Sequence, residues 1–227
     1  MSDNREIIAA VCPAGDECGL RQLVAELSKQ VESLNRLVLT DPLTGLHNYR
    51  HFSHSLDQEM ERCRRSGQPC CLVMVDLDHF KQVNDTHGHE VGNQVLVQTA
   101  ELIQSSLRKL DIACRYGGEE FIVILPNTGL SDAVRVAERI RLAIAAKPLQ
   151  LDNADITLNA SLGVDIFHRQ DGDTPEVFTA RVDAQLYRAK ASGRNRVCCS
   201  DSDKIERRLE VTQSEKDVLS GLFSSED

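Results

Sequence analysis

Residues 112–126, IACRYGGEEFIVILP, constrain the fold of this chain more than any other stretch. Two apolar runs flank a pair of glycines, and Pro126 closes the second run. Apolar runs joined by a short turn that contains glycine are typical of a β-hairpin. The sequence therefore predicts an antiparallel pair of strands whose turn carries two adjacent carboxylates, Glu119 and Glu120.

Strand-like and helix-like patterns alternate on both sides of this hairpin. Buried or alternating strands are predicted over residues 70–78, 156–167 and 196–199. Helices are predicted over residues 49–66, 92–110, 131–146 (with Ser131 as N-cap) and 174–193. A hairpin within such a series favours an α/β (α+β) sandwich, in which helices cover a central, mainly antiparallel sheet.

An apolar seam precedes this domain, with steps of 4-3-4-3-4 at Leu20, Val24, Leu27, Val31, Leu34 and Val38. An unbroken heptad spacing predicts a coiled-coil stalk over residues 20–39 that pairs two copies of the chain. The alternative is a single amphipathic helix that lies on the globular domain. We therefore divide the chain into a flexible N-terminus (1–19), the stalk (20–39), a globular domain (40–199) and an acidic tail (200–227).

The composition narrows the classes of function. The formal net charge is −9, which argues against a nucleic-acid partner because a phosphate backbone requires basic patches. No apolar run approaches the roughly 18 residues of a membrane helix, and the acidic start lacks the basic region of a signal peptide. We expect a cytoplasmic protein whose eight cysteines are reduced. The segment CPAGDEC and the pair His87 and His89 lack the partners that a zinc site needs.

Carboxylates gather at predicted strand ends. Asp76 and Asp78 end the apolar run CCLVMVDLD, and the hairpin turn supplies Glu119 and Glu120. Together they form an oxygen-ligand cluster suited to Mg²⁺ or Mn²⁺, whose charge offsets the repulsion between the carboxylates. The alternative is an acidic turn exposed to water.

The polar segment 78–93 follows directly, where substrate contacts are expected beside a metal site. Lys81 has the charge to bind a phosphate, and Asn84 has the donor and acceptor to bind the edge of a base. Lys190 and Arg194, near a predicted helix end, are either phosphate contacts or ordinary surface charges.

Five segments resemble, in order and spacing, the GGDEF domain of diguanylate cyclases: DPLTGLHNYR, DLDHFKQVNDTHGHEVGNQVL, RYGGEEF, ASLGV and YRAKASGRN. The resemblance covers residues 40–199. It implies a fold like the nucleotidyl-cyclase and polymerase palm, with the signature on the hairpin. It also implies a dimer that condenses two GTP molecules, one held by each subunit, into cyclic di-GMP with release of pyrophosphate.

The resemblance also implies roles for individual residues. Mg²⁺ or Mn²⁺ would be held by Asp76, the Leu77 carbonyl, Glu119 and Glu120, and Glu119 would take the proton of the attacking 3′-hydroxyl. The substrate would be contacted at its phosphates and beside the turn by Lys81, Lys190, Arg194, Gly117 and Gly118. Its guanine and ribose would be contacted by Asn84, His89 and Asn93.

Position 93 departs from the family pattern, because the usual residue there is Asp. Asn93 keeps one acceptor oxygen but loses the charge-assisted hydrogen bond to guanine. We expect GTP to remain the preferred substrate, with weaker selectivity against ATP.

The segment RKLD, residues 108–111, lies at the position of the family's inhibitory site. Arg108 and Asp111, with Arg139 on the next predicted helix, are the candidate contacts for the cyclic di-GMP product. Two other functions stay open: a receptor that binds cyclic di-GMP without turnover, and a scaffold that docks a partner. The stalk either sets the homodimer by itself or binds a separate regulatory protein that stabilises the dimer.

Overall fold

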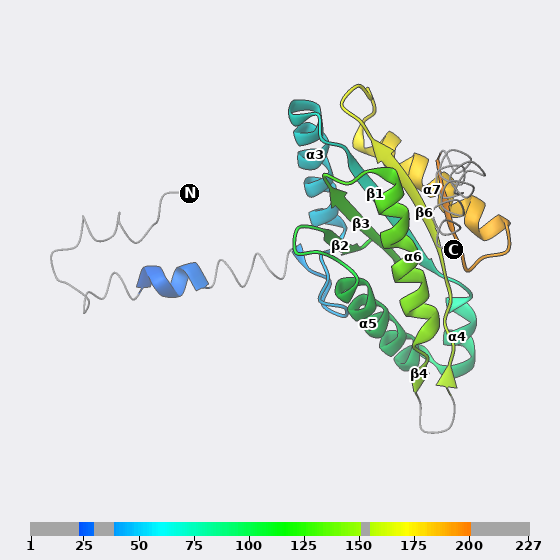
Figure 1. Ribbon diagram of the computed structural model, residues 1–227. Helices are drawn as coiled ribbons and strands as arrows, with labels where there is room; N and C mark the ends of the chain where they lie inside the picture. Colours follow the sequence, from blue (N-terminus) through cyan, green and yellow to red (C-terminus); the bar gives the residue numbers. More distant parts are fainter. Residues whose placement is uncertain (1–22, 30–38, 151–154, 201–227) are drawn as a thin grey trace, which may run out of the picture.

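A five-stranded sheet forms the centre of the molecule (Figure 1). The computed structural model describes residues 23–29, 39–150 and 155–200. In spatial order the strands are β2 (Ile112–Arg115), β3 (Glu120–Pro126), β1 (Cys70–Leu77), β6 (Ala160–Phe167) and β7 (Val197–Cys199). The β6–β7 ladder is parallel and the other three are antiparallel. The predicted fold class is confirmed, with the signature on the β2–β3 hairpin.

Helices cover both faces of the sheet. They are α5 (His89–Ser105) and α6 (Leu130–Ala146) on one face, and α3 (Tyr49–Ser66) and α7 (Pro175–Ala191) on the other. Val73 and Val75 of β1 pack in the core that contains α5 and α6, whereas Leu72 and Met74 pack in the core that contains α3 and α7. Because both faces of β1 are buried, its sequence is continuously apolar rather than alternating.

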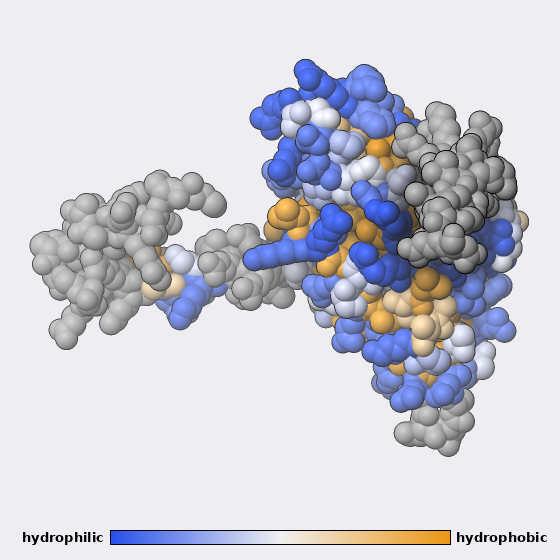
Figure 2. All heavy atoms as spheres, in the orientation of Figure 1, coloured by the Kyte–Doolittle hydropathy of each residue, from blue (hydrophilic) through white to orange (hydrophobic). Residues whose placement is uncertain are grey.

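Polar and apolar residues are also separated on the surface of the described domain. Hydrophilic residues cover most of the outer edge of the described domain in one view, and hydrophobic residues show mainly near its middle (Figure 2). Among the residues that the structure describes, no helix is long and apolar enough to cross a membrane. Burial raises the pKa of the thiols of Cys70 and Cys114 to about 12, so these two cysteines are packing residues with little thiolate character.

Three predicted elements are confirmed, α3 with its predicted bounds and the others with small shifts at their ends. Helix α3 begins after Asn48, whose Oδ1 accepts a hydrogen bond from His51 N at 3.1 Å, and it ends at Gly67 with φ of 77°. Helix α7 has Thr174 as its N-cap and Pro175 in its first turn. The hairpin strands end at Arg115 and begin again at Glu120. In each case local turn and capping residues mark the boundary.

Other boundaries were predicted wrongly. The polar segment after β1 contains a helix, α4 (Phe80–His87), and α5 begins at His89 and ends at Ser105 rather than spanning residues 92–110. Only Phe80 of α4 is buried, so this short helix has too few apolar positions to show a helical period. The N-cap of α6 is Gly129, and Ser131 lies inside the helix.

The predicted strand 156–167 is divided in the structure. Residues Asp155–Ile156 form β5, which pairs with β4 (Leu149–Gln150) in a separate two-stranded sheet, and β6 begins at Ala160. The final predicted strand is β7, with one residue fewer than expected.

Most of the predicted stalk lies outside the described residues. Residues 23–29 are helical, and Leu23 and Leu27 in this segment are 55% and 50% exposed. Leu27 belongs to the predicted seam, whereas Leu23 lies outside it, and the coiled coil stays a prediction. The predicted N-terminal segment 1–19 and residues 201–227 of the acidic tail also lie outside the described residues.

Gly163 of β6 provides a test of the packing between sheet and helix. A Cβ at this position would collide with the backbone N of Leu186 and the backbone O of Val182 on α7. We expect Gly163→Ala to lower the free energy of unfolding by about 1–3 kcal/mol, because α7 must move away from the sheet. Urea denaturation measures the change.

The control is Gly172→Ala, at a position where a Cβ would meet no atom within 4 Å. Equal stability of the two variants would contradict the close contact between α7 and β6.

Candidate active site

The signature turn is closed by its own backbone. The N–H groups of Tyr116 and Gly117 both donate to the Glu120 carbonyl, at 2.8 and 3.2 Å. A Cβ on Gly117 would approach the Glu120 Oε2 to 2.7 Å, whereas a Cβ on Gly118 would meet nothing within 4 Å. A side chain at Gly117 would therefore displace the Glu120 carboxylate from its present position, and Gly118 keeps the space outside the turn open.

An arginine clamps this turn from the side. Nη2 of Arg115 donates to the Gly118 carbonyl at 2.7 Å, and Nη1 lies 3.2 Å from both carboxylate oxygens of Asp41. Asp41 also accepts hydrogen bonds from the N and Oγ1 of Thr44, at 2.9 and 2.7 Å. Burial raises the pKa of Asp41, but the Thr44 hydrogen bonds and the Arg115 charge outweigh it and hold the pKa below the ordinary value.

Asp41, Thr44 and Arg115 had no function predicted from the sequence. Two signals were available: an Asp three residues before a Thr is typical of a side-chain-capped turn, and Arg115 directly precedes the glycine turn. Neither signal indicates that the two segments meet, because 74 residues separate Asp41 from Arg115.

The strand register brings the predicted carboxylates together. Asp76 of β1 lies opposite Glu120 of β3, and Leu77 N is 3.5 Å from the Glu119 carbonyl oxygen. Met74 and Ile122, two residues from this pair along each strand, pack in the core beneath α3 and α7. Side chains alternate along a strand, so Asp76 and Glu120 point to this same face.

A lysine of α7 balances part of the negative charge. Lys190 Nζ lies 2.8 Å from Asp76 Oδ2, and the Asp76 side chain is only 8% exposed. Burial raises the pKa of Asp76, and so does the charge of Asp78, against the opposing effect of Lys190. Burial, followed by the charge of Asp76, also raises the pKa of Glu119 and Glu120. When Asp76, Glu119 and Glu120 are ionised, the positive charge of Lys190 therefore offsets only part of their negative charge.

The donor chemistry of this site fits a hard divalent cation. Carboxylate and carbonyl oxygens are the ligands that Mg²⁺ and Mn²⁺ prefer. Within the described ranges, no group of three or more His, Cys, Asp or Glu side chains is close enough to hold a metal in the present arrangement. The ammonium of Lys190 supplies positive charge beside Asp76.

Asp78 has a different role from the one its sequence position suggested. Its Oδ1 accepts from Ser161 Oγ at 2.7 Å, and its Oδ2 accepts from the backbone N of Asn195 at 2.9 Å. Both carboxylate oxygens are thus occupied by bonds that hold strand β6 and the loop after α7. Asp78 positions neighbouring segments and lies outside the group formed by Asp76 and Glu120.

The loop after α7 carries Arg194 in an unusual backbone conformation. Gly193, Arg194 and Asn195 have φ values of 111°, 62° and 44°, and such values are costly for residues other than glycine. Besides the Asp78 bond, Nη1 of Arg141 on α6 donates to Asn195 Oδ1 at 2.8 Å. Arg141 therefore helps to fix the loop that presents Arg194, and no sequence signal links these distant positions.

The residues expected to contact the base and ribose lie around the corner between α4 and α5, together with Lys81, the expected phosphate contact. Lys81 on α4 and His89 and Asn93 on α5 are exposed. A Cβ on Gly92 would overlap with Asn84 Oδ1, so the Asn84 amide lies directly against the first turn of α5. The structure therefore brings Asn84 to the turn of α5 that carries His89 and Asn93.

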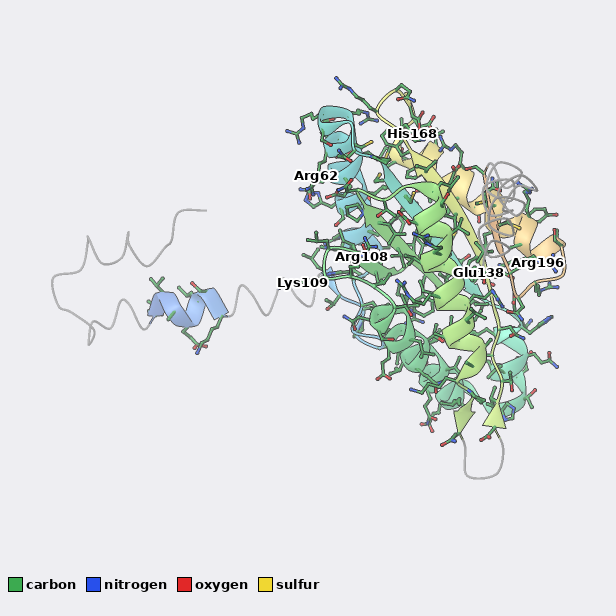
Figure 3. All side chains as sticks on the ribbon, viewed as in Figure 1. Arg62, Arg108, Lys109, Glu138, His168 and Arg196 are labelled. Atoms are coloured by element: carbon green, nitrogen blue, oxygen red, sulfur yellow. The ribbon has the colours of Figure 1, made fainter. Side chains whose placement is uncertain are left out.

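The RKLD segment forms a turn closed by its own ends. Arg108 N donates to Asp111 Oδ2 at 2.8 Å, and Asp111 N donates to the Arg108 carbonyl at 3.0 Å. The turn borders a hollow of about 340 Å³, and Arg108 and Lys109 lie next to each other at its exposed edge (Figure 3). Nε and Nη2 of Arg139 donate to the Ser106 carbonyl at 3.1 and 2.6 Å, at the end of α5.

Comparisons with known proteins agree with this geometry. Residues 38–196 match the family described as "Diguanylate cyclase, GGDEF domain". The response regulator PleD of Caulobacter vibrioides is 44% identical over 162 residues, which are 71% of this chain and 36% of PleD. The chain thus spans about a third of the length of that relative.

Two solved structures are similar over most of the chain. One is the coiled coil and GGDEF domain of DgcB from Caulobacter crescentus in complex with c-di-GMP, with a TM-score of 0.75 and 32% identity, covering 79% of this chain and 95% of that one. The other is diguanylate cyclase SiaD in complex with its activator SiaC from Pseudomonas aeruginosa, with a TM-score of 0.70 and 39% identity, covering 80% and 73%.

The charge imbalance at the turn generates a stability prediction. We expect Glu119→Gln to raise the midpoint of thermal unfolding in EDTA near pH 7.5, because the ionised carboxylate is disfavoured by burial and by Asp76. A raised folded-state pKa destabilises the fold only where the group is ionised. The gain should therefore disappear as the pH falls to about 4, below the ordinary pKa of a glutamate.

Glu101→Gln, which neutralises an exposed carboxylate of α5, is the matched control and should change the midpoint little. A lower midpoint for Glu119→Gln, or a gain that does not depend on pH, would contradict the electrostatic explanation.

Proposed function

The chain belongs to the GGDEF domain family of diguanylate cyclases, and on that premise we propose that it condenses two GTP molecules into cyclic di-GMP. One observation carries the proposal: the β1–β3 register sets Asp76 opposite Glu120 beside an open glycine turn, with Lys190 2.8 Å from Asp76. Nucleotidyl transfer requires carboxylates that bind a metal, a lysine that binds phosphate, and space for the substrate beside them.

Mg²⁺ or Mn²⁺ would be held by the carboxylates of Asp76, Glu119 and Glu120 and by the Leu77 carbonyl. When bound, the metal would neutralise phosphate charge and polarise the α-phosphate. Lys190 would then be available to the phosphates, alongside Lys81 and Arg194. Two hydrogen bonds support this role: Arg115 donates to the Gly118 carbonyl, and Asn195 N donates to Asp78. They hold the signature turn and the loop after α7 in place before a substrate arrives.

Glu119 is our candidate for the group that takes the proton of the attacking 3′-hydroxyl. Burial raises the pKa of this carboxyl, which makes it a better proton acceptor than an exposed glutamate. The 3′ oxygen of one GTP forms a bond to the α-phosphorus of the other, and the bond from that phosphorus to the bridging oxygen breaks. Pyrophosphate leaves, and the second transfer closes the ring in the same way.

Guanine and ribose are contacted in this proposal by Asn84, His89 and Asn93, and the backbone at Gly117 and Gly118 approaches the nucleotide. Because Asn93 lacks the charge of an aspartate, guanine selectivity rests on one amide oxygen and on Asn84. We propose that GTP remains the preferred substrate over ATP.

Each subunit would contribute one GTP, so the reaction requires a homodimer. The DgcB structure contains a coiled coil and a GGDEF domain, and SiaD was solved in complex with its activator SiaC. We propose that the N-terminal helix pairs two copies of this chain. The alternative is that a regulatory protein binds this helix and stabilises the productive dimer.

A receptor that binds cyclic di-GMP without turnover, or a docking module, is the alternative function. The cyclase is favoured because Asp76 and the turn from Gly117 to Phe121 keep every group that the chemistry requires. We also propose product inhibition through Arg108 and Asp111 with Arg139. Asp111 already shapes its turn through its bond to Arg108 N, so the Arg108 side chain extends from a fixed turn toward the ligand.

Turnover with GTP and Mg²⁺ tests the proposed function directly. We expect the purified chain to form cyclic di-GMP, and Asp76→Asn to lower the rate at least about a hundredfold because a metal ligand is lost. Chromatography identifies the product. Asp57→Asn, at an exposed site on α3, should keep the full rate. An inactive parent chain that binds cyclic di-GMP tightly would identify a receptor, and equal turnover of ATP would contradict GTP preference.

Feedback by the product is tested with Arg108→Ala. This substitution removes the guanidinium and leaves the Arg108 N–H that donates to Asp111, so the turn keeps its shape. We expect unchanged initial rates and at least a tenfold higher inhibitory concentration of added cyclic di-GMP.

Lys109→Ala removes the neighbouring exposed cation and serves as the control, with inhibition close to that of the parent chain. Unaltered inhibition of Arg108→Ala would exclude this turn as the product site.

A further inference from the structure

A second cavity lies beside the signature turn, between α3 and α7, with a volume of about 370 Å³. Its apolar lining comes from Phe52 and Leu56 of α3 and Met74 of β1, all at most 3% exposed. Pockets that bind small molecules usually have about 300–1,000 Å³ and combine an apolar lining with a few polar groups. The volume and the lining of this cavity meet both conditions.

Two tyrosine rings add aromatic surface to the lining. The rings of Tyr49 and Tyr116 are 5.4 Å apart in a T-shaped arrangement, and Tyr116 makes a second such contact with Phe52, also at 5.4 Å. Tyr49 is 56% exposed although it is a large aromatic residue. A ligand that enters the cavity would therefore meet ring faces and edges that are already held in place by each other.

The charged groups of the cavity all have one sign. Glu120 of the signature turn and Glu176 and Asp183 of α7 contribute to the lining, and no Lys, Arg or His is among the described residues that line it. Glu176 and Asp183 have no part in the proposed cyclase reaction. The lining therefore includes two exposed carboxylates, Glu176 and Asp183, that no cation of the lining offsets and that the chemistry of GTP leaves unused.

We propose that this cavity binds a small organic cation that carries a planar amidinium or guanidinium group on an apolar body. The apolar part would pack on Phe52, Leu56 and Met74, and the charged group would lie near the tyrosine rings and donate to the carboxylates. Phosphate-bearing ligands would be repelled by three carboxylates. A neutral apolar ligand would remove these carboxylates from water without replacing their hydrogen bonds.

Glu120 belongs both to this cavity and to the proposed metal cluster. Its side chain lines the cavity, and its strand position is opposite Asp76. A cation that engages Glu120 would compete with the metal for this carboxylate and slow turnover. This consequence rests on the proposed function, whereas binding to the cavity does not.

Benzamidinium and its neutral isostere benzamide, which differ in charge but hardly in shape, form a matched pair of probes. Binding of each to the full chain is measured by calorimetry and by ligand-observed NMR, without nucleotide or metal. We expect saturable one-to-one binding of benzamidinium and at least tenfold weaker binding of benzamide. Equal affinities, or no binding of either probe, would overturn the proposal.

Three variants locate the bound cation. Asp183→Asn and Glu176→Gln should each weaken benzamidinium binding about tenfold, because each removes one charged acceptor. Glu101→Gln, on the opposite side of the sheet, should leave the affinity unchanged. The thermal unfolding midpoint of each variant verifies that it is folded.

Equal affinity of all three variants would overturn the site even if benzamidinium binds. Because no turnover is needed, the chain could bind benzamidinium and yet fail to use GTP. That result would leave this inference intact and refute the proposed function.

Discussion

The antiparallel register between β1 and β3 is the constraint on which the rest of the site depends. It sets Asp76 opposite Glu120 at the end of two strands that are otherwise buried and apolar. A shift of one residue would turn Asp76 toward the core that contains α5 and α6 and would exchange the apolar side chains of β1 between the two cores. The hydrophobic burial of the two strands therefore fixes where the carboxylates meet.

This arrangement concentrates negative charge, and the surrounding contacts limit its cost. Lys190 reaches Asp76 from α7, while Arg115 fixes the turn through the Gly118 carbonyl. Asp78 and Arg141 hold the loop that bears Arg194. Groups that are held in place before a substrate binds need little rearrangement during the reaction, which is the main contribution of a protein to nucleotidyl transfer.

Much of the fold could be predicted because local patterns were strong. Eight consecutive apolar or acidic residues ended by Leu77 predict a buried strand, and Asn48, Thr174 and Pro175 mark helix starts. Helix α4 could not be predicted, because only Phe80 of its residues is buried. Ser131 was assigned the wrong role because a good capping residue near a helix start is no proof that the helix begins there.

The candidate site was also predictable from the sequence only in part. Asp76 and Glu120 were predicted to meet from residue type and position, and the strand register sets them opposite each other. Lys190 was left open as a phosphate contact or a surface charge, and its ion pair with Asp76 was not predicted. The bonds of Arg141 to Asn195 and of Asp78 to Ser161 were not recognised, because they join segments that are far apart in the chain. Residue type indicates what a side chain is able to bind, but it carries no information about which distant segment will lie within reach.

The amino-acid sequence was sufficient for the order of helices and strands apart from α4 and the β4–β5 pair, for the glycine turn with its two glutamates, and for the family to which the chain belongs. These properties follow from local periodicity, backbone preferences and residue chemistry, which act over a few neighbouring positions. The tertiary structure alone decided that Asp41 braces the signature turn and that Asp183 and Glu176 share a cavity with Glu120. Such contacts arise from packing both faces of one sheet, and packing joins residues without regard to their distance along the chain.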